Sequence, residues 1–250
     1  MYYSGTSGLV LNILTSDFPA EFKASSRLNY YATLFNSVEI NSTFYKLPRA
    51  KTVTNWSESV PSNFKFTLKV PKVISHCPVF EFDENDVQNF LELIPNLGGK
   101  LGCLLLQFPP SLTIDKIDRL QEFLEIVTFF DKTIRVAIEF RNVSWYATKT
   151  HNLVQQFNAS IVFHDLNGGE MKLDTAVSNF VYIRFHGNEP RYRGNYSDKE
   201  LEKAATFVRK NIGAERDIYV YFNNTVGSAF ENLQTFNEMV LGSPPSKNIK

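Results

Sequence analysis

Short runs of residues, either alternating apolar with polar or continuously apolar, recur along the chain and predict eight β-strands. They cover residues 2–6, 37–41, 64–69, 102–107, 133–140, 160–164, 179–186 and 217–223. Between them, apolar residues recur every three or four positions, which is the spacing of one face of an α-helix. The strand starts are about 30 residues apart, so the pattern predicts a repeated strand-then-helix unit.

Eight alternating units predict an α/β fold, namely a single TIM-type (β/α)8-barrel that spans residues 1–250 as one domain. In a closed barrel every strand can be parallel and no edge remains exposed. No Gly-rich dinucleotide fingerprint follows the first strand, which disfavours a Rossmann sheet. Residues 165–178 include Gly168 and Gly169 and are too few for a full crossover helix, so we expect a short sixth crossover.

Several of these strands carry a polar set of residues on one face. In residues 133–140, for example, Arg135 and Glu139 alternate with Val136 and Ile138. The apolar sets must face the helices, so the polar sets are expected to face the barrel axis. Buried charges are costly unless they are paired or solvated. They collect toward the C-terminal strand ends, where barrel enzymes place catalytic groups: Glu39, Asn41, Lys69, Gln107, Glu139, Arg141, His164, Arg184, His186 and Asn223.

These residue types suggest roles at the mouth of the barrel. Glu39 and Glu139 are candidates for general acid and base, and His164 and His186 for proton transfer. Lys69, Arg141 and Arg184 together favour an anion, since the planar arginine fork binds two oxygens of a phosphate or carboxylate. The alternative is a closed network of ion pairs in which the same charges satisfy one another.

A metal centre is a weaker hypothesis. His164, His186, Asp165 and Glu139 are suitable ligands for a divalent ion. Three cationic side chains at the same mouth would repel it, so we expect no bound metal, and the sequence points to no other cofactor.

Aromatic side chains are expected beside the charges, as a stacking surface for a sugar or a base. The candidates are Phe44, Tyr45, Trp145, Tyr192 and Tyr196. Residues 191–196 also lead into a helix with a Ser197-x-x-Glu200 capping box, and this loop often binds phosphate in barrels.

The overall charge limits the choice of partner. Twenty-six basic residues balance 26 acidic ones, so no global field draws the molecule to nucleic acid or to an anionic membrane. Neither a signal-peptide pattern nor a membrane-length apolar run is present, and only two cysteines occur, which together predict a soluble, cytoplasmic protein without a disulfide framework. The sequence makes no prediction about an oligomeric partner.

Nine motifs in a fixed order resemble the YecE-like family, catalogued as domain of unknown function 72. They are Gly5-Thr6-Ser7-Gly8, Val38-Glu39-Ile40-Asn41-Ser42-Thr43-Phe44-Tyr45, Lys69-x-Pro71 with His76, Leu105-Leu106-Gln107-Phe108-Pro109-Pro110, Glu139-Phe140-Arg141-x-x-Ser144-Trp145, His164-Asp165, Tyr182-x-Arg184-Phe185-His186-Gly187, Tyr192-x-Gly194-x-Tyr196 and Tyr219-x-Tyr221-Phe222-Asn223-Asn224. The resemblance implies a TIM-type barrel with these motifs around its mouth, and it implies no established reaction. It adds His76, Asp165 and Asn224 to the candidate substrate-binding residues. Leu9 and Asn142 stand where the family commonly has Trp and His.

The sequence thus leads to two functional hypotheses. The first is an enzyme, a hydrolase or lyase, acting on a small phosphorylated or otherwise anionic substrate, with or without a sugar. The second is a non-catalytic binding protein for nucleic acid or a phosphorylated metabolite. Arginines interleaved with aromatics suit single-stranded nucleic acid, but the neutral overall charge favours the small anionic ligand.

Overall fold

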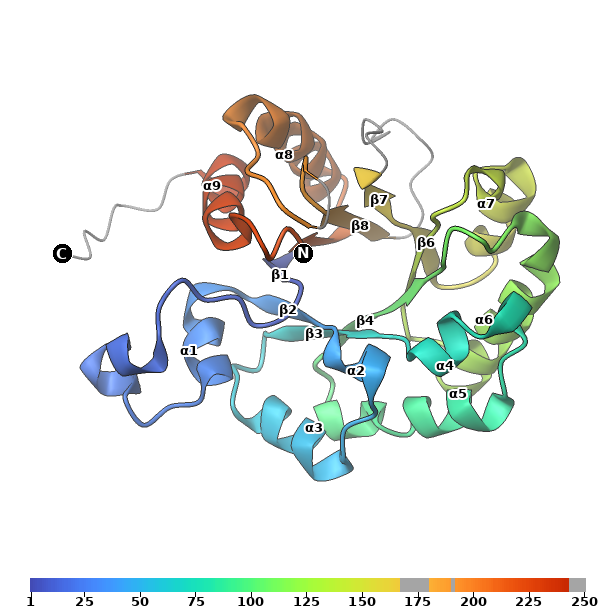
Figure 1. The fold of residues 1–250 in the computed structure, drawn as a ribbon, viewed down its shortest axis with the longest axis horizontal. Helices are drawn as coiled ribbons and strands as arrows, with labels where there is room; N and C mark the ends of the chain where they lie inside the picture. Colours follow the sequence, from blue (N-terminus) through green and yellow to red (C-terminus); the bar gives the residue numbers. More distant parts are fainter. Residues whose placement is uncertain (167–179, 190–191, 243–250) are drawn as a thin grey trace.

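The computed structural model describes residues 1–166, 180–189 and 192–242. Its strands gather at the centre and its helices surround them (Figure 1). The strands are β1 (Tyr2–Thr6), β2 (Ser37–Ile40), β3 (Lys65–Lys69), β4 (Leu101–Gln107), β5 (Val136–Glu139), β6 (Ala159–Ile161), β7 (Phe163–His164), β8 (Phe180–Phe185) and β9 (Asp217–Phe222).

The α-helices follow the strands in sequence, so that strand and helix alternate along most of the chain. They are α1 (Arg27–Leu34), α2 (Ser42–Tyr45), α3 (Ala50–Glu58), α4 (Lys72–Ser75), α5 (Glu84–Leu91), α6 (Ile117–Phe130), α7 (Thr148–Gln155), α8 (Asp198–Gly213) and α9 (Ala229–Leu241). Short 3-10 turns lie at Thr15–Asp17, Ala20–Phe22, Pro78–Phe80, Ile94–Leu97, Ile114–Lys116 and Val143–Trp145. Among the residues just described, no helix is both long and apolar enough to cross a membrane.

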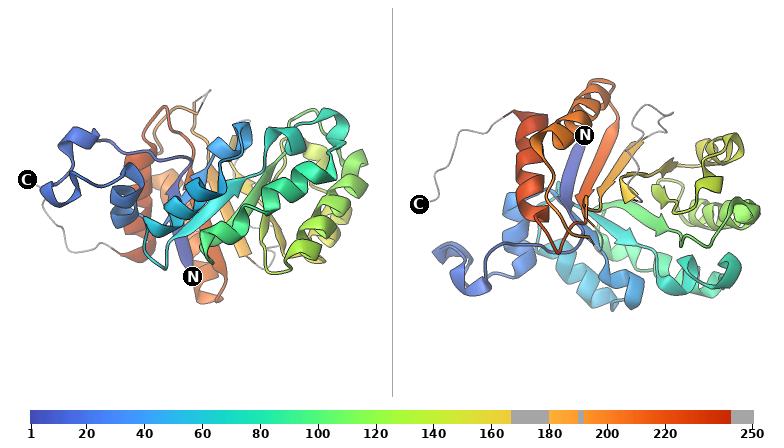
Figure 2. Two further views of the ribbon diagram at one scale, coloured as in Figure 1. Left: turned by 90° about the horizontal axis from the view of Figure 1, so that it is seen from below. Right: turned by 45° about the horizontal axis from the view of Figure 1, so that its top comes forward.

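Hydrogen bonding arranges the strands in two parallel sheets. One has the order β1-β9-β8-β7, and the other has the order β2-β3-β4-β5-β6. Each of the eight predicted strands has a counterpart, and the α/β class with parallel pairing is confirmed. Two views in Figure 2 show the helices on the outside of these strands.

Two predicted strands differ in detail from the structure. Residues 133–135 precede β5, because Asp131 forms a turn in which its side chain accepts from the amide of Thr133 at 2.8 Å. The predicted strand 160–164 is divided at Val162, since β6 pairs with β5 whereas β7 pairs with β8. The predicted short sixth crossover falls mainly on residues 167–179, which lie outside the described residues.

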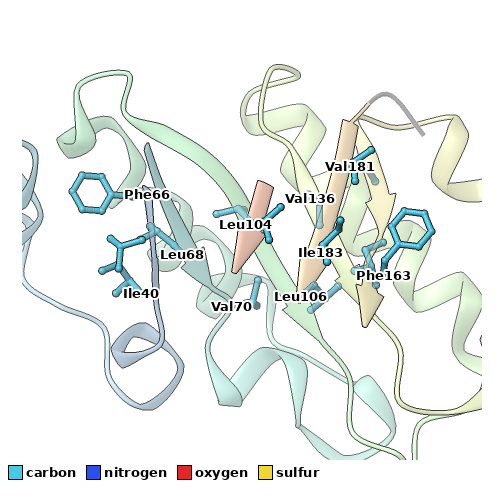
Figure 3. Close-up of a cluster of buried hydrophobic side chains, with 14 of the residues drawn as sticks. Ile40, Phe66, Leu68, Val70, Leu104, Leu106, Val136, Phe163, Val181 and Ile183 are labelled. Carbon is cyan, nitrogen blue, oxygen red and sulfur yellow. The ribbon is translucent and has the colours of Figure 1, made fainter. Parts of the chain in front are cut away.

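The alternation along the strands separates two buried clusters. The larger one lies between the strands and the helices and includes Val136, Val181 and Ile183 (Figure 3). The smaller one uses the opposite faces of the strands and includes Ala137, Tyr182, Tyr219 and Tyr221. Both sets follow the predicted faces, so the polar and aromatic positions do share the interior face.

One glycine makes room for this aromatic interior. A Cβ atom on Gly102 would lie 2.8 Å from Cε1 of Tyr219. Tyr219 in turn stacks on Tyr3, with 5.0 Å between the ring centroids. Large rings therefore fill the space beneath the C-terminal strand ends, and polar side chains stand above them.

Candidate functional site

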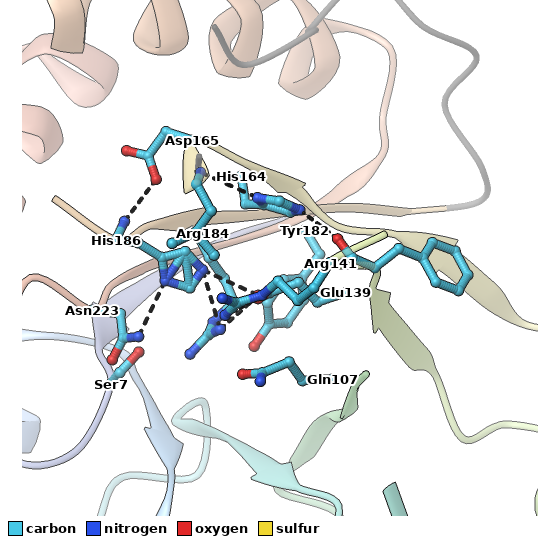
Figure 4. A network of polar contacts seen from close by, with 12 residues as sticks. Ser7, Gln107, Glu139, Arg141, His164, Asp165, Tyr182, Arg184, His186 and Asn223 are labelled. Atoms are coloured by element: carbon cyan, nitrogen blue, oxygen red, sulfur yellow. Dashed lines mark hydrogen bonds and ion pairs between the residues drawn. The ribbon is translucent and has the colours of Figure 1, made fainter. Parts of the chain in front are cut away.

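The candidate site is a cluster of charges at the C-terminal ends of β2, β3, β5 and β8, and Figure 4 shows the part of it around Arg184, Glu139 and Arg141. At its centre the guanidinium of Arg184 lies between two carboxylates. Its Nη2 donates to Oε1 of Glu39 at 2.7 Å and its Nε to Oε2 of Glu39 at 3.0 Å. Nη1 donates to Oε2 of Glu139 at 2.5 Å. All three side chains are fully buried.

Further hydrogen bonds fix Glu39 in this cluster. Ser7 donates through Oγ to Oε1 of Glu39 at 2.7 Å, and Tyr182 donates through its hydroxyl to Oε2, also at 2.7 Å. Both Glu39 oxygens therefore accept two hydrogen bonds. Neither Ser7 nor Tyr182 was predicted as a site residue, although Ser7 stands in the first motif and Tyr182 opens the motif that contains Arg184.

Arg184 was predicted to bind an anionic ligand, and the structure corrects that prediction. Each nitrogen of its guanidinium is used by Glu39 or Glu139, and the side chain has no exposed surface. The two carboxylates raise the pKa of Arg184 even though burial alone would lower it. For this residue the ion-pair alternative describes the structure.

Arg141 and Lys69 form the more open side of the cluster. Arg141 donates through Nε to Oε1 of Glu139 at 2.5 Å, and its side chain is 11% exposed. Its Nη2 is at ion-pair distance from the same oxygen but makes no aligned hydrogen bond. Lys69 donates through Nζ to Oε1 of Gln107 at 2.9 Å and lies 4.4 Å from the ring centroid of Phe44.

Glu139 is ionised in this setting, and His186 is neutral. Burial alone would raise the pKa of Glu139, but Arg184 and Arg141 hold it well below its usual range. Burial holds the pKa of His186 well below its usual range despite the nearby Glu139. The amide nitrogen of Asn223 lies 3.1 Å from Nδ1 of His186, and Nε2 lies 3.3 Å from Oε2 of Glu139. Nε2 also lies 3.4 Å from Nη1 of Arg184, so this ring nitrogen faces both a carboxylate and a guanidinium.

His164, the other predicted proton-transfer group, is held by backbone atoms. Its Nε2 lies 2.9 Å from the carbonyl oxygen of Phe140, and its Nδ1 accepts from the amide of Leu166 at 3.3 Å. Tyr146, which sequence reasoning missed, brings its hydroxyl within 3.1 Å of Nε2. Both ring nitrogens of His164 are thus in hydrogen-bonding contact with backbone atoms. His164 therefore connects neighbouring strand ends and has no free nitrogen for a substrate.

Asp165 and Tyr196 also support the site and do not face a ligand. Asp165 accepts from the backbone amide of His186 at 2.9 Å and, through its other oxygen, from the hydroxyl of Tyr196. That hydroxyl accepts from the amide of Gly187 at 2.5 Å. Burial raises the pKa of Asp165. Tyr196 is buried, so its predicted stacking role is wrong: its ring packs against Phe185.

Trp145 was predicted to line the mouth, and this prediction is also wrong. The side chain is fully buried, stacks on Phe140 with 4.6 Å between centroids, and donates from Nε1 to the carbonyl of Leu112 at 2.8 Å. Two of the other predicted aromatics, Tyr45 and Tyr192, are 81% and 41% exposed. Arg191, in the same loop as Tyr192, lies outside the described residues.

Three further predicted residues, His76, Asn41 and Asn224, differ in their surroundings. His76 packs its ring edge-on to Phe44, at 5.0 Å between centroids, and burial together with Lys69 lowers its pKa to about 4. Asn41 has a buried Oδ1 that finds no hydrogen-bond partner among the described residues. Asn224 is buried and donates to the carbonyl of Gly194 at 3.1 Å, which fixes the loop after β8.

The described part of the chain contains no group of three or more His, Cys, Asp or Glu side chains arranged to hold a metal ion. The candidate metal ligands of the sequence are instead used within the cluster. Glu139 binds two arginines, Asp165 binds Tyr196, and His164 binds backbone atoms.

Fold and site together define an α/β protein with a TIM-barrel-like arrangement and a buried charge cluster at the C-terminal strand ends. The family model described as "Protein of unknown function DUF72" matches residues 3–248, so the chain belongs to the DUF72 family.

Relatives and solved structures agree with this assignment. The UPF0759 protein YunF of Bacillus subtilis is 26% identical, with 85% of each chain covered. A DUF72 family protein from Thermotoga maritima of known structure is 28% identical with a TM-score of 0.79, covering 96% of this chain and 99% of that one. A xylose isomerase domain containing protein from Salmonella typhimurium is 14% identical with a TM-score of 0.54, covering 93% and 98%, and supports the fold alone.

Proposed function

We propose that this protein is an enzyme, a hydrolase or lyase, that acts on a small substrate carrying a phosphate or carboxylate. The observation that carries the proposal is the charge balance of the cluster. The cluster contains three cations and two carboxylates, namely Arg184, Arg141 and Lys69 with Glu39 and Glu139. Both carboxylates form ion pairs with Arg184. The excess positive charge therefore lies on Arg141 and Lys69, on the side that solvent can reach.

The same geometry narrows the roles of the carboxylates. Both oxygens of Glu39 and both oxygens of Glu139 already accept hydrogen bonds from cations or hydroxyls. A general acid must carry a proton, and the low pKa of Glu139 leaves it ionised. In this proposal the two glutamates hold the cations in place, and Lys69 is the group left for proton transfer. His186 is buried, and its ring nitrogens contact Asn223, Glu139 and Arg184.

We also propose that the two sheets close into one TIM-type barrel with its mouth at this cluster. The ends of β1 and β2 are joined by a parallel bridge between Ser7 and Glu39, and Gly8 donates to the carbonyl of Glu39 at 2.7 Å. Val162, between β6 and β7, donates to the carbonyl of Ile138 at 2.9 Å. TIM-type barrels bind substrates at this end of the strands.

Anion binding tests the proposed function. Phosphate should raise the melting temperature of the native protein at constant ionic strength, because a ligand that binds only the folded state stabilises it. A charge-assisted contact contributes roughly 1.5–3 kcal/mol, so Arg141→Ala should weaken phosphate binding about ten- to a hundredfold. The quantity to compare is the phosphate-induced rise within each variant, since the substitutions also change the starting stability.

Arg209→Ala is the control for this test. Arg209 pairs with Glu202 on the surface of α8, with 40% of its side chain exposed, and lies outside the cluster. Phosphate should raise the melting temperature of Arg209→Ala by as much as it raises that of the native protein. If phosphate raises the melting temperatures of both Arg141→Ala and Lys69→Met by as much as that of the native protein, the anion site is elsewhere.

A further inference from the structure

Lys69 differs from the arginines of the cluster in the partner of its charged group. Its Nζ donates to a neutral amide oxygen, Oε1 of Gln107, at 2.9 Å. Among the residues that the structure describes, no carboxylate lies within 4.0 Å of that nitrogen. Glu39 and Glu139 face Arg184 and Arg141 instead. The Lys69 amine is thus held at the strand end without the ion pair that would fix it in its charged form.

The surroundings of the amine are apolar on one side and cationic on the other. The Phe44 ring lies 4.4 Å from Nζ, and the neutral His76 ring packs against Phe44. Burial, followed by the charge of Arg184, lowers the pKa of Lys69 to about 8. At pH 7.5 the neutral fraction of such an amine is about 200 times that of an ordinary lysine.

We propose that Lys69 is a nucleophile that forms a Schiff base with the carbonyl carbon of a substrate whose phosphate or carboxylate lies against Arg141. This inference rests on the proposed function, since Arg141 supplies the anion contact. It names the substrate class: small aldehydes or ketones that also carry an anionic group. Lysine amines that are desolvated or placed beside other cations are activated for this chemistry.

The chemical step balances without a further reactant. The lone pair of Nζ forms a bond to the carbonyl carbon, and the carbonyl π electrons move to oxygen. The nitrogen keeps one hydrogen, while its other hydrogen and one proton from water leave with that oxygen as a water molecule. The resulting iminium can accept the electron pair of a bond that joins the adjacent α-carbon to one of its other substituents. Breaking such a bond is the reaction of a lyase.

Reductive trapping tests the proposal on the full-length native protein. The protein is incubated at pH 7.5 with pyruvate or dihydroxyacetone phosphate and sodium cyanoborohydride, which reduces the iminium to a stable amine. Mass spectrometry should find one adduct per chain, and peptide mapping should place it on Lys69. Its rate of formation should exceed that of an ordinary exposed lysine by roughly a hundredfold. The adduct should be absent from Lys69→Arg.

Lys65 provides a matched control at the opposite end of the same strand. Its pKa is also lowered, by burial and by Arg135, but its Nζ donates to the carbonyl of Gly99, away from the cluster. Lys65→Arg should be trapped like the native protein. Adducts spread over many lysines, or none on Lys69, would overturn the proposal.

A second measurement does not depend on any variant. The rate at which trinitrobenzenesulfonate modifies Lys69 in the native protein should rise with pH around a midpoint near 8, and a midpoint near that of an ordinary lysine would contradict the assignment. If phosphate still stabilises the protein through Arg141 while no adduct forms, the anion site stands and only the Schiff-base role fails. If neither is observed, both proposals fail.

Discussion

Arg184 illustrates how a buried charge is tolerated. A lone buried ion is expensive, but an arginine that meets two carboxylates with its planar fork recovers part of that cost through charge-assisted hydrogen bonds. Glu39 and Glu139 come from strands far apart in sequence, and Arg184 joins them across the interior. The residue therefore connects β2, β5 and β8 beneath the open side of the site.

Replacing Arg184 should be strongly destabilising. Arg184→Met keeps much of the side-chain volume but leaves two carboxylates buried without their shared partner, and breaking a buried pair in this way costs about 3–5 kcal/mol. Urea unfolding followed by circular dichroism measures the change in the free energy of unfolding. Arg209→Met, which removes an exposed ion pair with Glu202 and an exposed hydrogen bond to the carbonyl of Met239, should cost about 1 kcal/mol. Similar losses in the two variants would show that the buried network contributes little.

At the level of single residues, the sequence predicted which side chains would meet but not how they would pair. The period of two along a strand places Glu39, Glu139 and Arg184 on the interior face, and they are found there. Which arginine takes both carboxylates depends on distances between strands, which no local pattern contains. Trp145 was misplaced for a related reason: it follows a strand end, but a 3-10 turn directs its ring back into the core.

The secondary-structure elements were easier to predict, because their signals are local. The Ser197-x-x-Glu200 pattern begins α8, where the Ser197 side chain accepts from the amide of Glu200 and the Glu200 side chain accepts from the amide of Ser197. The prediction missed the division of residues 160–164, because the two halves bond to different neighbouring strands. Tertiary pairing decides such a break, and the alternation of side chains continues through it.

The capping box of α8 should be measurable by substitution. Ser197→Ala removes the hydroxyl that accepts from the Glu200 amide and donates to the Glu200 carboxylate, and it should lower the free energy of unfolding by about 1 kcal/mol. Ser228 is the matched control, since it occupies the corresponding position before α9 but its side chain makes no capping hydrogen bond. In chemical denaturation Ser228→Ala should change stability by less than about 0.5 kcal/mol. Equal effects would mean that the capping bond adds nothing beyond the serine itself.

For the whole molecule, the sequence predicted eight parallel strands in a closed barrel, whereas hydrogen bonding in the structure leaves β1 and β2 at the edges of two sheets. Between these strands the structure shows one parallel bridge at their ends and no extended ladder. Nearer the N-terminal end of β1, the side chain of Asn36 forms the hydrogen bonds that the backbone of a neighbouring strand would otherwise form. Its Oδ1 accepts from the amide of Ser4 at 2.9 Å, and its Nδ2 donates to the carbonyl of Tyr2 at 2.9 Å. The chain also passes closely here, since a Cβ atom on Gly5 would lie 2.0 Å from the carbonyl oxygen of Ser37.

Asn36 should therefore be needed to hold β1 against β2. Asn36→Ala leaves one amide and one carbonyl of β1 without a partner in a partly buried seam, and we expect a loss of about 2 kcal/mol in the free energy of unfolding. Hydrogen exchange should show faster exchange at the Ser4 amide, while Leu105 in the centre of β4 stays protected. Asn158→Ala is the control, because that amide makes one exposed hydrogen bond, to the carbonyl of Thr133 at 3.1 Å. If Asn36→Ala matches this control and Ser4 keeps its protection, then β1 is held to β2 without the asparagine, through the Ser7–Glu39 bridge and close packing at Gly5.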